Sequence, residues 1–99
     1  MEELKTDGDG FLINRSDWTE EVMYMLAGKD GLTLTAEHCK YIIAAREMFE
    51  QNGTVPSIRD FAKHFGMDRK AKELYELFES GPMKRIAKYG GLTKPTGCV

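Results

Sequence analysis

The chain has 99 residues, of which 41% are hydrophobic and 30% are charged, and its formal net charge is −2. This composition is ordinary for a soluble protein with one modest core, and the slight acidity excludes a polycationic nucleic-acid-binding protein. No apolar run approaches the roughly 18 residues that span a membrane, and residues 1–5 lack the apolar stretch of a signal peptide. We therefore expect a cytoplasmic protein.

The chain has two cysteines, Cys39 and Cys98. In the cytoplasm they are expected to be thiols rather than a structural disulfide, because disulfides are rare there. Neither cysteine stands with His38 or His64 at a spacing that is typical of zinc ligands, so we expect no metal site.

The first predicted element is a turn at residues 7–10, Asp-Gly-Asp-Gly. Glycine supplies positive φ angles, and aspartate side chains close turns by accepting backbone hydrogen bonds. The turn separates a short N-terminal segment from the apolar residues 11–13, a pattern that predicts a small β-hairpin.

Helical spacing follows in five segments. In the first, Asp17 and Glu20 form a predicted capping box, and Gly28 is expected to end the helix. Its apolar positions are Trp18, Val22, Met25 and Leu26. We expect Trp18 to belong to the core.

The second predicted helix begins after Thr35 and ends at Asn52 and Gly53. The side chains at steps of three or four form its inward face: His38, Tyr41, Ile42, Ala45 and Phe49. We interpret His38 as a packed histidine that bonds to the backbone, and Cys39 beside it as a bystander thiol.

Three shorter helices follow. The third starts at Pro56-Ser57 and stops at Gly66, and the fourth is capped by Asp68. The last runs from Pro82, which favours the first helical position, to about Tyr89. Their expected inward residues are Ile58, Phe61, Ala62, Phe65, Ala71, Leu74, Tyr75, Phe78, Met83, Ile86 and Tyr89.

The chain ends in a predicted arm, residues 90–99, with Cys98 in the next-to-last position. Its glycines supply flexibility, whereas Pro95 stiffens the path locally. Ten extended residues reach roughly 30 Å, far enough to enter the active site of another protein. The arm therefore indicates transfer of a group that a thiol can hold, such as a sulfur atom.

Short motifs follow one another through nearly the whole chain. They are Asp9-Gly10-Phe11-Leu12, Asp17-Trp18, Leu34-Thr35 with His38, Arg46, Pro56, Arg59, Leu77-Phe78, Gly81-Pro82, and the ending Gly91-Leu92 with Lys94-Pro95-Thr96-Gly97-Cys98-Val99. With these motifs, and above all with its penultimate cysteine, the chain resembles the DsrC/TusE family of small sulfur-carrier proteins.

The resemblance implies an α+β fold with a small meander sheet. Together with the residue patterns it predicts a mainly helical α+β protein. A small N-terminal β-hairpin or meander packs on about five helices in a single domain of residues 1–89, followed by the flexible arm of residues 90–99.

The resemblance also implies that Cys98 carries the chemistry and that no cofactor is needed. The DsrC branch has a second reactive cysteine eleven residues before the last one, where this chain has Ala87. This difference points to the TusE-like branch, in which one cysteine relays persulfide sulfur toward 2-thiouridine in tRNA.

The implied partners are a persulfide donor protein upstream and a thiolation enzyme, or a sulfite reductase, downstream. The protein would be a covalent sulfur carrier rather than an enzyme that turns over alone. A DsrC-like role in dissimilatory sulfur metabolism is the alternative within the family.

Several basic residues are candidates for docking the arm or a partner. Arg46 and Arg59 could hold the arm or its terminal carboxylate through bidentate hydrogen bonds, or they could be surface charges. A second set favours ionisation of the Cys98 thiol and could attract an acidic partner, or could form a solvated helix face. It comprises Lys84, Arg85, Lys88 and Lys94.

A DNA-binding module is the alternative from another class. The third and fourth helices, with a break at Gly66-Met67, resemble a helix-turn-helix. The region is locally basic through Arg59, Lys63, His64, Arg69, Lys70 and Lys72. Interrupting acids (Asp60, Asp68 and Glu73) count against this alternative.

Overall fold

The structure is a computed structural model that describes residues 5–67, 71–79 and 81–93. These residues form a short 3-10 helix, η1 (Arg15–Asp17), and five α-helices. The helices are α1 (Glu20–Lys29), α2 (Ala36–Asn52), α3 (Ile58–His64), α4 (Lys72–Phe78) and α5 (Pro82–Tyr89). None of the helices in this part of the chain has the length and apolarity needed to cross a lipid bilayer.

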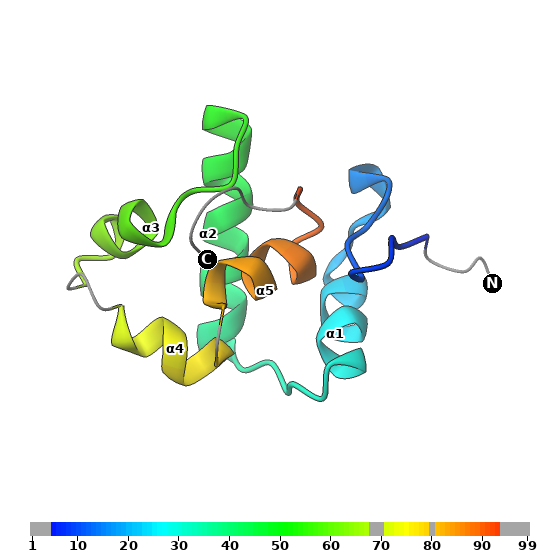
Figure 1. Ribbon diagram of the computed structural model, residues 1–99, viewed down its shortest axis with the longest axis horizontal. Coiled ribbons are helices and arrows are strands. Elements are labelled where there is room, and N and C mark those ends of the chain that lie inside the picture. The colour runs from blue at the N-terminus through cyan, green and yellow to red at the C-terminus, as the bar shows by residue number, and fades with distance from the viewer. Residues whose placement is uncertain (1–4, 68–70, 80, 94–99) are drawn as a thin grey trace.

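The short helix α5 lies at the centre of the fold. It contacts α1, α2 and α4, and Figure 1 shows it crossing α2, with α1 on one side and α3 and α4 on the other. Five of its eight residues are buried. A polar helix of this length is not stable alone, so burial against three neighbours holds it in place.

The predicted N-terminal β element is wrong for the described residues, which contain no β-strand. A single antiparallel bridge joins Thr6 and Leu12. The carboxylate of Asp7 accepts the N–H groups of Asp9 and Phe11 and so closes a turn. Pairing stops after Ile13, because Asn14 caps η1 and directs the chain into a helical turn. The fold is therefore helical rather than α+β in the described ranges.

Three helices end in the same hydrogen-bonded turn, with a glycine of positive φ. After α1, the N–H of Leu32 donates to the carbonyl of Ala27, across Gly31. Matching bonds from Met67 to Ala62 and from Leu92 to Ala87 close α3 and α5. This is the Schellman motif, in which glycine avoids the steric cost of the left-handed conformation. The prediction that Gly28 ends the first helix is wrong, because the turn forms three residues later.

The start of α1 also differs from the prediction. Its N-cap is Thr19, whose hydroxyl accepts the N–H of Val22, while Asp17 lies in η1. Met25 and Tyr75 were expected inside but are about half exposed. Asp68, the expected cap of α4, lies outside the described residues.

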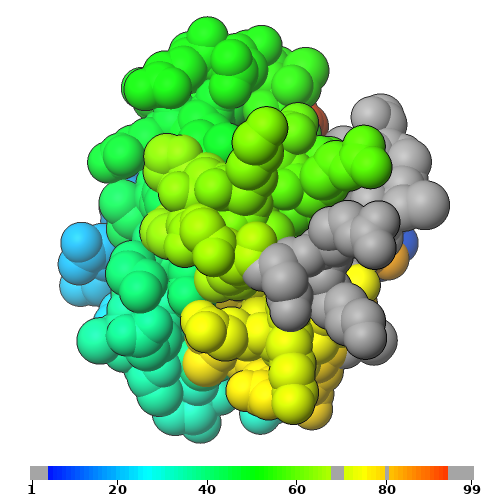
Figure 2. Space-filling view, turned by 90° about the vertical axis from the view of Figure 1, so that its left-hand side faces the viewer, coloured from blue at the N-terminus to red at the C-terminus, as the bar shows by residue number. Residues whose placement is uncertain are grey.

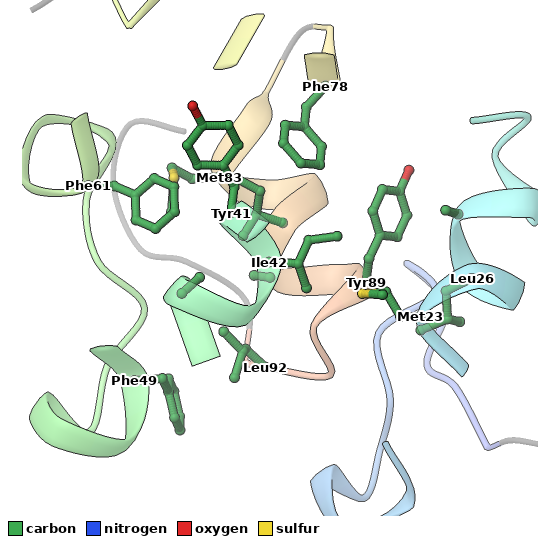
Figure 3. Packing of buried hydrophobic residues seen from close by; sticks show 14 of the residues in the cluster. Met23, Leu26, Tyr41, Ile42, Phe49, Phe61, Phe78, Met83, Tyr89 and Leu92 are labelled. Carbon is green, nitrogen blue, oxygen red and sulfur yellow. The ribbon is translucent and has the colours of Figure 1, made fainter. Parts of the chain in front are cut away.

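The inward face of α2 is confirmed, since all five expected side chains are buried. Figure 3 shows three of them, Tyr41, Ile42 and Phe49, in the core that α5 crosses. The expected inward residues of α5 (Met83, Ile86 and Tyr89) are buried as well.

His38 is the one buried polar residue among the described side chains, and every polar atom of its ring has a partner. Its Nδ1 accepts the N–H of Thr35 at 3.0 Å, so the proton lies on Nε2, 2.8 Å from the carbonyl of Leu77. The ring also meets Phe78 edge to face. The histidine thus ties the start of α2 to the end of α4, as expected for a packed, backbone-bonded side chain.

We predict that His38→Ala lowers the free energy of unfolding by roughly 3 kcal/mol, because two hydrogen bonds and a buried ring are lost. Urea denaturation measures the change. His64→Ala, at an exposed position in α3, is the control and should cost about 0.5 kcal/mol or less. Equal losses in the two variants would contradict a structural role for His38.

Candidate functional site

The candidate site is the place where the predicted arm leaves the helical body. The described residues end at Thr93, so Cys98 and Lys94 lie outside them. We call residues 90–93 the arm root. Its position fixes where the predicted arm begins.

The arm root is built as the C-terminal turn of α5. The N–H groups of Gly90, Gly91 and Leu92 donate to the carbonyls of Ile86, Lys88 and Ala87. Leu92 is buried and belongs to the same core cluster as Ile42 of α2, which Figure 3 also shows. The first residues of the predicted arm are therefore packed into the body.

Trp18 satisfies the next carbonyl of α5. Its indole N–H donates to the carbonyl of Tyr89 at 2.8 Å. The ring also lies so close to the arm root that a Cβ on Gly91 would stand 2.8 Å from Trp18 Cδ1. The backbone of Gly91 has a φ angle of +66° as well. Both observations explain why glycine stands at this position.

Arg46 is a second side chain that contacts the arm root. Its guanidinium stacks over the Trp18 ring, with Cζ 3.7 Å from the ring centroid, and it donates to the carbonyl of Gly90. Burial lowers the pKa of Arg46, although arginine remains charged at physiological pH. Of the two arginines that the sequence suggested for docking, Arg46 contacts the arm root, while Arg59 is exposed on α3.

The basic side chains of α5 lie away from these contacts with the arm root. Lys88 forms a salt bridge of 2.8 Å with Asp30, which follows α1. Tyr89 donates its hydroxyl to the same carboxylate at 2.8 Å and accepts a hydrogen bond from Arg85. Lys84 is exposed on the neighbouring turn. Lys88 and Tyr89 thus join α5 to Asp30 at the end of α1, whereas Arg85 contacts Tyr89 and Glu79.

Burial and the hydrogen bond to Asp30 raise the pKa of Tyr89 to about 12. Partial burial acts against ionisation of Asp30, but the hydrogen bonds from Lys88 and Tyr89 prevail and lower its pKa. The pair therefore keeps a neutral phenol beside a carboxylate at physiological pH.

Cys39 lies on α2, partly buried. Its sulfur is 3.3 Å from the hydroxyl of Tyr24, and this hydrogen bond raises the pKa of Tyr24. The contact joins α1 to α2, in keeping with the expectation of a bystander thiol.

Sequence reasoning missed the role of Trp18, which was expected only in the core, and the pairing of Asp30 with Tyr89. The motif Asp17-Trp18 was the signal that could have indicated the first. No spacing pattern marks the second, because 59 residues separate the two partners.

Comparisons with known proteins point to one family. A family model described as "DsrC like protein" matches residues 1–99. The Sulfurtransferase TusE of Photorhabdus laumondii is 37% identical over 103 residues, which cover 99% of this chain and 93% of that protein. The dissimilatory-type sulfite reductase subunit gamma of Nitratidesulfovibrio vulgaris is 39% identical, covering 97% of this chain and 90% of that protein.

Solved structures of similar proteins share the fold of this chain. The NMR structure of Allochromatium vinosum DsrC superimposes with a TM-score of 0.85 at 38% identity, over 99% of this chain and 92% of that one. The crystal structure of the oxidized gamma-subunit (DsrC) from Archaeoglobus fulgidus gives 0.83 at 36% identity, over 99% and 94%.

We predict that Gly91→Ala destabilises the protein by roughly 3 kcal/mol, because the new methyl group would overlap Trp18 and the backbone conformation would be strained. Gly31→Ala is a matched control. Gly31 has a similar φ of +77°, but a Cβ added there would meet no atom within 4 Å. It should cost only about 1 kcal/mol. Thermal denaturation compares the two, and equal costs would contradict close packing at the arm root.

We also predict that the Tyr89 phenol loses its proton at a higher pH than an ordinary tyrosine. In an alkaline titration followed by tyrosinate absorbance, one step near pH 12 should disappear in Tyr89→Phe and persist in Tyr75→Phe. Since the folded pKa lies above the unfolded value of about 10, the stability that Tyr89 contributes is complete below pH 10 and is lost as pH rises to 12. If Tyr89→Phe instead removes a step near pH 10 and leaves the step near pH 12, the phenol is not held by Asp30.

Proposed function

This chain belongs to the family of DsrC-like proteins, and we propose that it is a sulfur carrier that accepts persulfide sulfur on Cys98 and relays it to an acceptor protein. The observation that carries the proposal is the arm root. Trp18 and Arg46 bind the backbone of residues 89 and 90, and the sequence places Cys98 five residues beyond Thr93. A thiol on a tether with a fixed origin suits transfer between proteins.

The transfer step is a thiol exchange. The Cys98 thiolate attacks the outer sulfur of a donor persulfide, R–S–SH. A new S–S bond forms on Cys98 while the S–S bond of the donor breaks, and the donor thiolate leaves with the bonding electron pair. Sulfur moves without net oxidation, so the step requires no cofactor. The reverse exchange delivers the sulfur to an acceptor.

The position of Ala87 favours a one-cysteine relay. Its methyl group is buried in α5, and its carbonyl accepts the N–H of Leu92. Alanine has no thiol that could form a disulfide with Cys98. We therefore place the protein in a relay that leads to tRNA 2-thiouridine, with a persulfide donor protein upstream and a thiolation enzyme downstream. Exchange with a dissimilatory sulfite reductase is the alternative, since a relative carries that name.

The basic residues have supporting roles in this proposal. Arg46 holds the arm root, and the exposed Arg59 and Lys84, with Lys94, attract an acidic partner surface. Arg85 and Lys88 add to the same positive field, although Lys88 is also bound to Asp30. A cytoplasmic location, where thiols stay reduced, suits this chemistry.

The DNA-binding alternative gains no support. Figure 2 shows α3 above α4 on one face of the molecule. The basic residues of these two helices (Arg59, Lys63, His64 and Lys72) are exposed. Arg69 and Lys70 lie outside the described residues. The relatives of this chain are named for sulfur chemistry, and a DNA-binding role would give the penultimate cysteine no purpose.

We predict that incubation with glutathione persulfide adds about 32 Da, one sulfur atom, to the protein, because an accessible thiolate is the nucleophile. Cys98→Ser should abolish this addition. Cys39→Ser is the matched control and should retain it, since the Cys39 thiol is partly buried against Tyr24. Intact-mass analysis and peptide mapping measure the site.

Sulfur uptake by Cys98→Ser, or none by the wild type, would refute the carrier function. Circular dichroism of each variant confirms that the fold persists.

A further inference from the structure

A groove borders the arm root. It has a volume of about 760 Å³ and lies between residues 11–16 on one side and Leu92 and Thr93 on the other. Phe11, Leu12 and Leu92 line it with apolar atoms, although each of these side chains is largely buried. Asp7, Asn14, Arg15, Ser16 and Thr93 line the groove with polar groups. The groove is therefore a preformed surface of mixed polarity beside the place where the predicted arm begins, and Ile13 is its exposed apolar side chain.

Ile13 stands on this groove and is the most exposed large hydrophobic side chain among the described residues, at 67%. Its backbone is fixed, because its N–H donates to the carbonyl of Lys5 at 3.0 Å and because Asn14 caps η1 directly after it. An exposed apolar side chain on a fixed backbone loses little entropy on binding and so suits a protein interface.

The length of the arm restricts where a partner can lie. Cys98 is five residues beyond Thr93, and five extended residues span at most about 17 Å. When the partner's reactive cysteine is recessed in its own active site, part of that span is used inside the partner. The partner's surface must then come close to Thr93, and the groove with Ile13 is the surface beside Thr93.

We propose that the groove is the docking surface for the protein that exchanges sulfur with Cys98, and that this partner seats an apolar side chain against Ile13. The inference rests on the proposed carrier function and adds the partner's binding site to it. The groove binds the partner's surface while the arm enters its active site. Small persulfides, which have no such surface, do not use the groove.

The test compares protein donors with a small donor. The protein donors are a rhodanese charged with thiosulfate and a cysteine desulfurase charged with L-cysteine, and the small donor is glutathione persulfide. For Ile13→Glu we expect kcat/KM for sulfur uptake from a protein donor to fall at least tenfold. Uptake from glutathione persulfide should be unchanged.

Two variants serve as controls. Ile13→Leu keeps an apolar side chain and should retain transfer from the protein donors. Tyr75→Glu places the same charge at another exposed hydrophobic position, on α4, and should have no effect. Thermal denaturation confirms that each variant is folded.

The outcomes separate the two proposals. Equal transfer by Ile13→Glu and wild type from the protein donors would overturn the docking surface and leave the carrier function intact. So would a wild type that accepts sulfur from glutathione persulfide but from neither protein. A wild type that takes up no sulfur from any donor would refute the carrier function itself, and the docking surface with it.

Discussion

The structure depends on how the last carbonyl groups of α5 are satisfied. A helix leaves its last carbonyls without partners inside the helix, and at the centre of a fold water cannot supply them. Here the turn through Gly91 provides N–H donors for three of them. The Trp18 indole and the Arg46 guanidinium provide the next two. The same bonds fix α5 between its neighbours and set the starting point of the arm.

The chemistry is separated from the body that positions it. The arm root is buried and hydrogen-bonded, and α5 is held to α1 through Lys88, Tyr89 and Asp30. A carrier needs no oxyanion hole of its own, because the protein that meets Cys98 can supply the remaining groups. In the proposed function, the body has two tasks, which are to hold the predicted arm and to present a surface for docking.

The sequence predicted the parts of the fold that depend on local rules. The buried face of α2 follows from its apolar period, and Pro82 marked the start of α5. The hairpin prediction failed because pairing stops after Ile13, where Asn14 caps η1 and directs the chain into a helical turn. Trp18 and Tyr89 are 71 residues apart, so only the fold could show that they meet. The Cys98 proposal came from a motif, whereas Arg46 needed the structure to distinguish it from Arg59.

Trp18 is the only tryptophan in the chain, and it lies against the arm root with a cation above its ring. Indole emission responds to nearby charge and hydrogen bonding. The protein therefore carries an intrinsic fluorophore against the arm root, where the proposed exchange with a partner would change its surroundings. Stopped-flow fluorescence could follow each encounter in real time without a label, and any other tryptophan signal would belong to the partner.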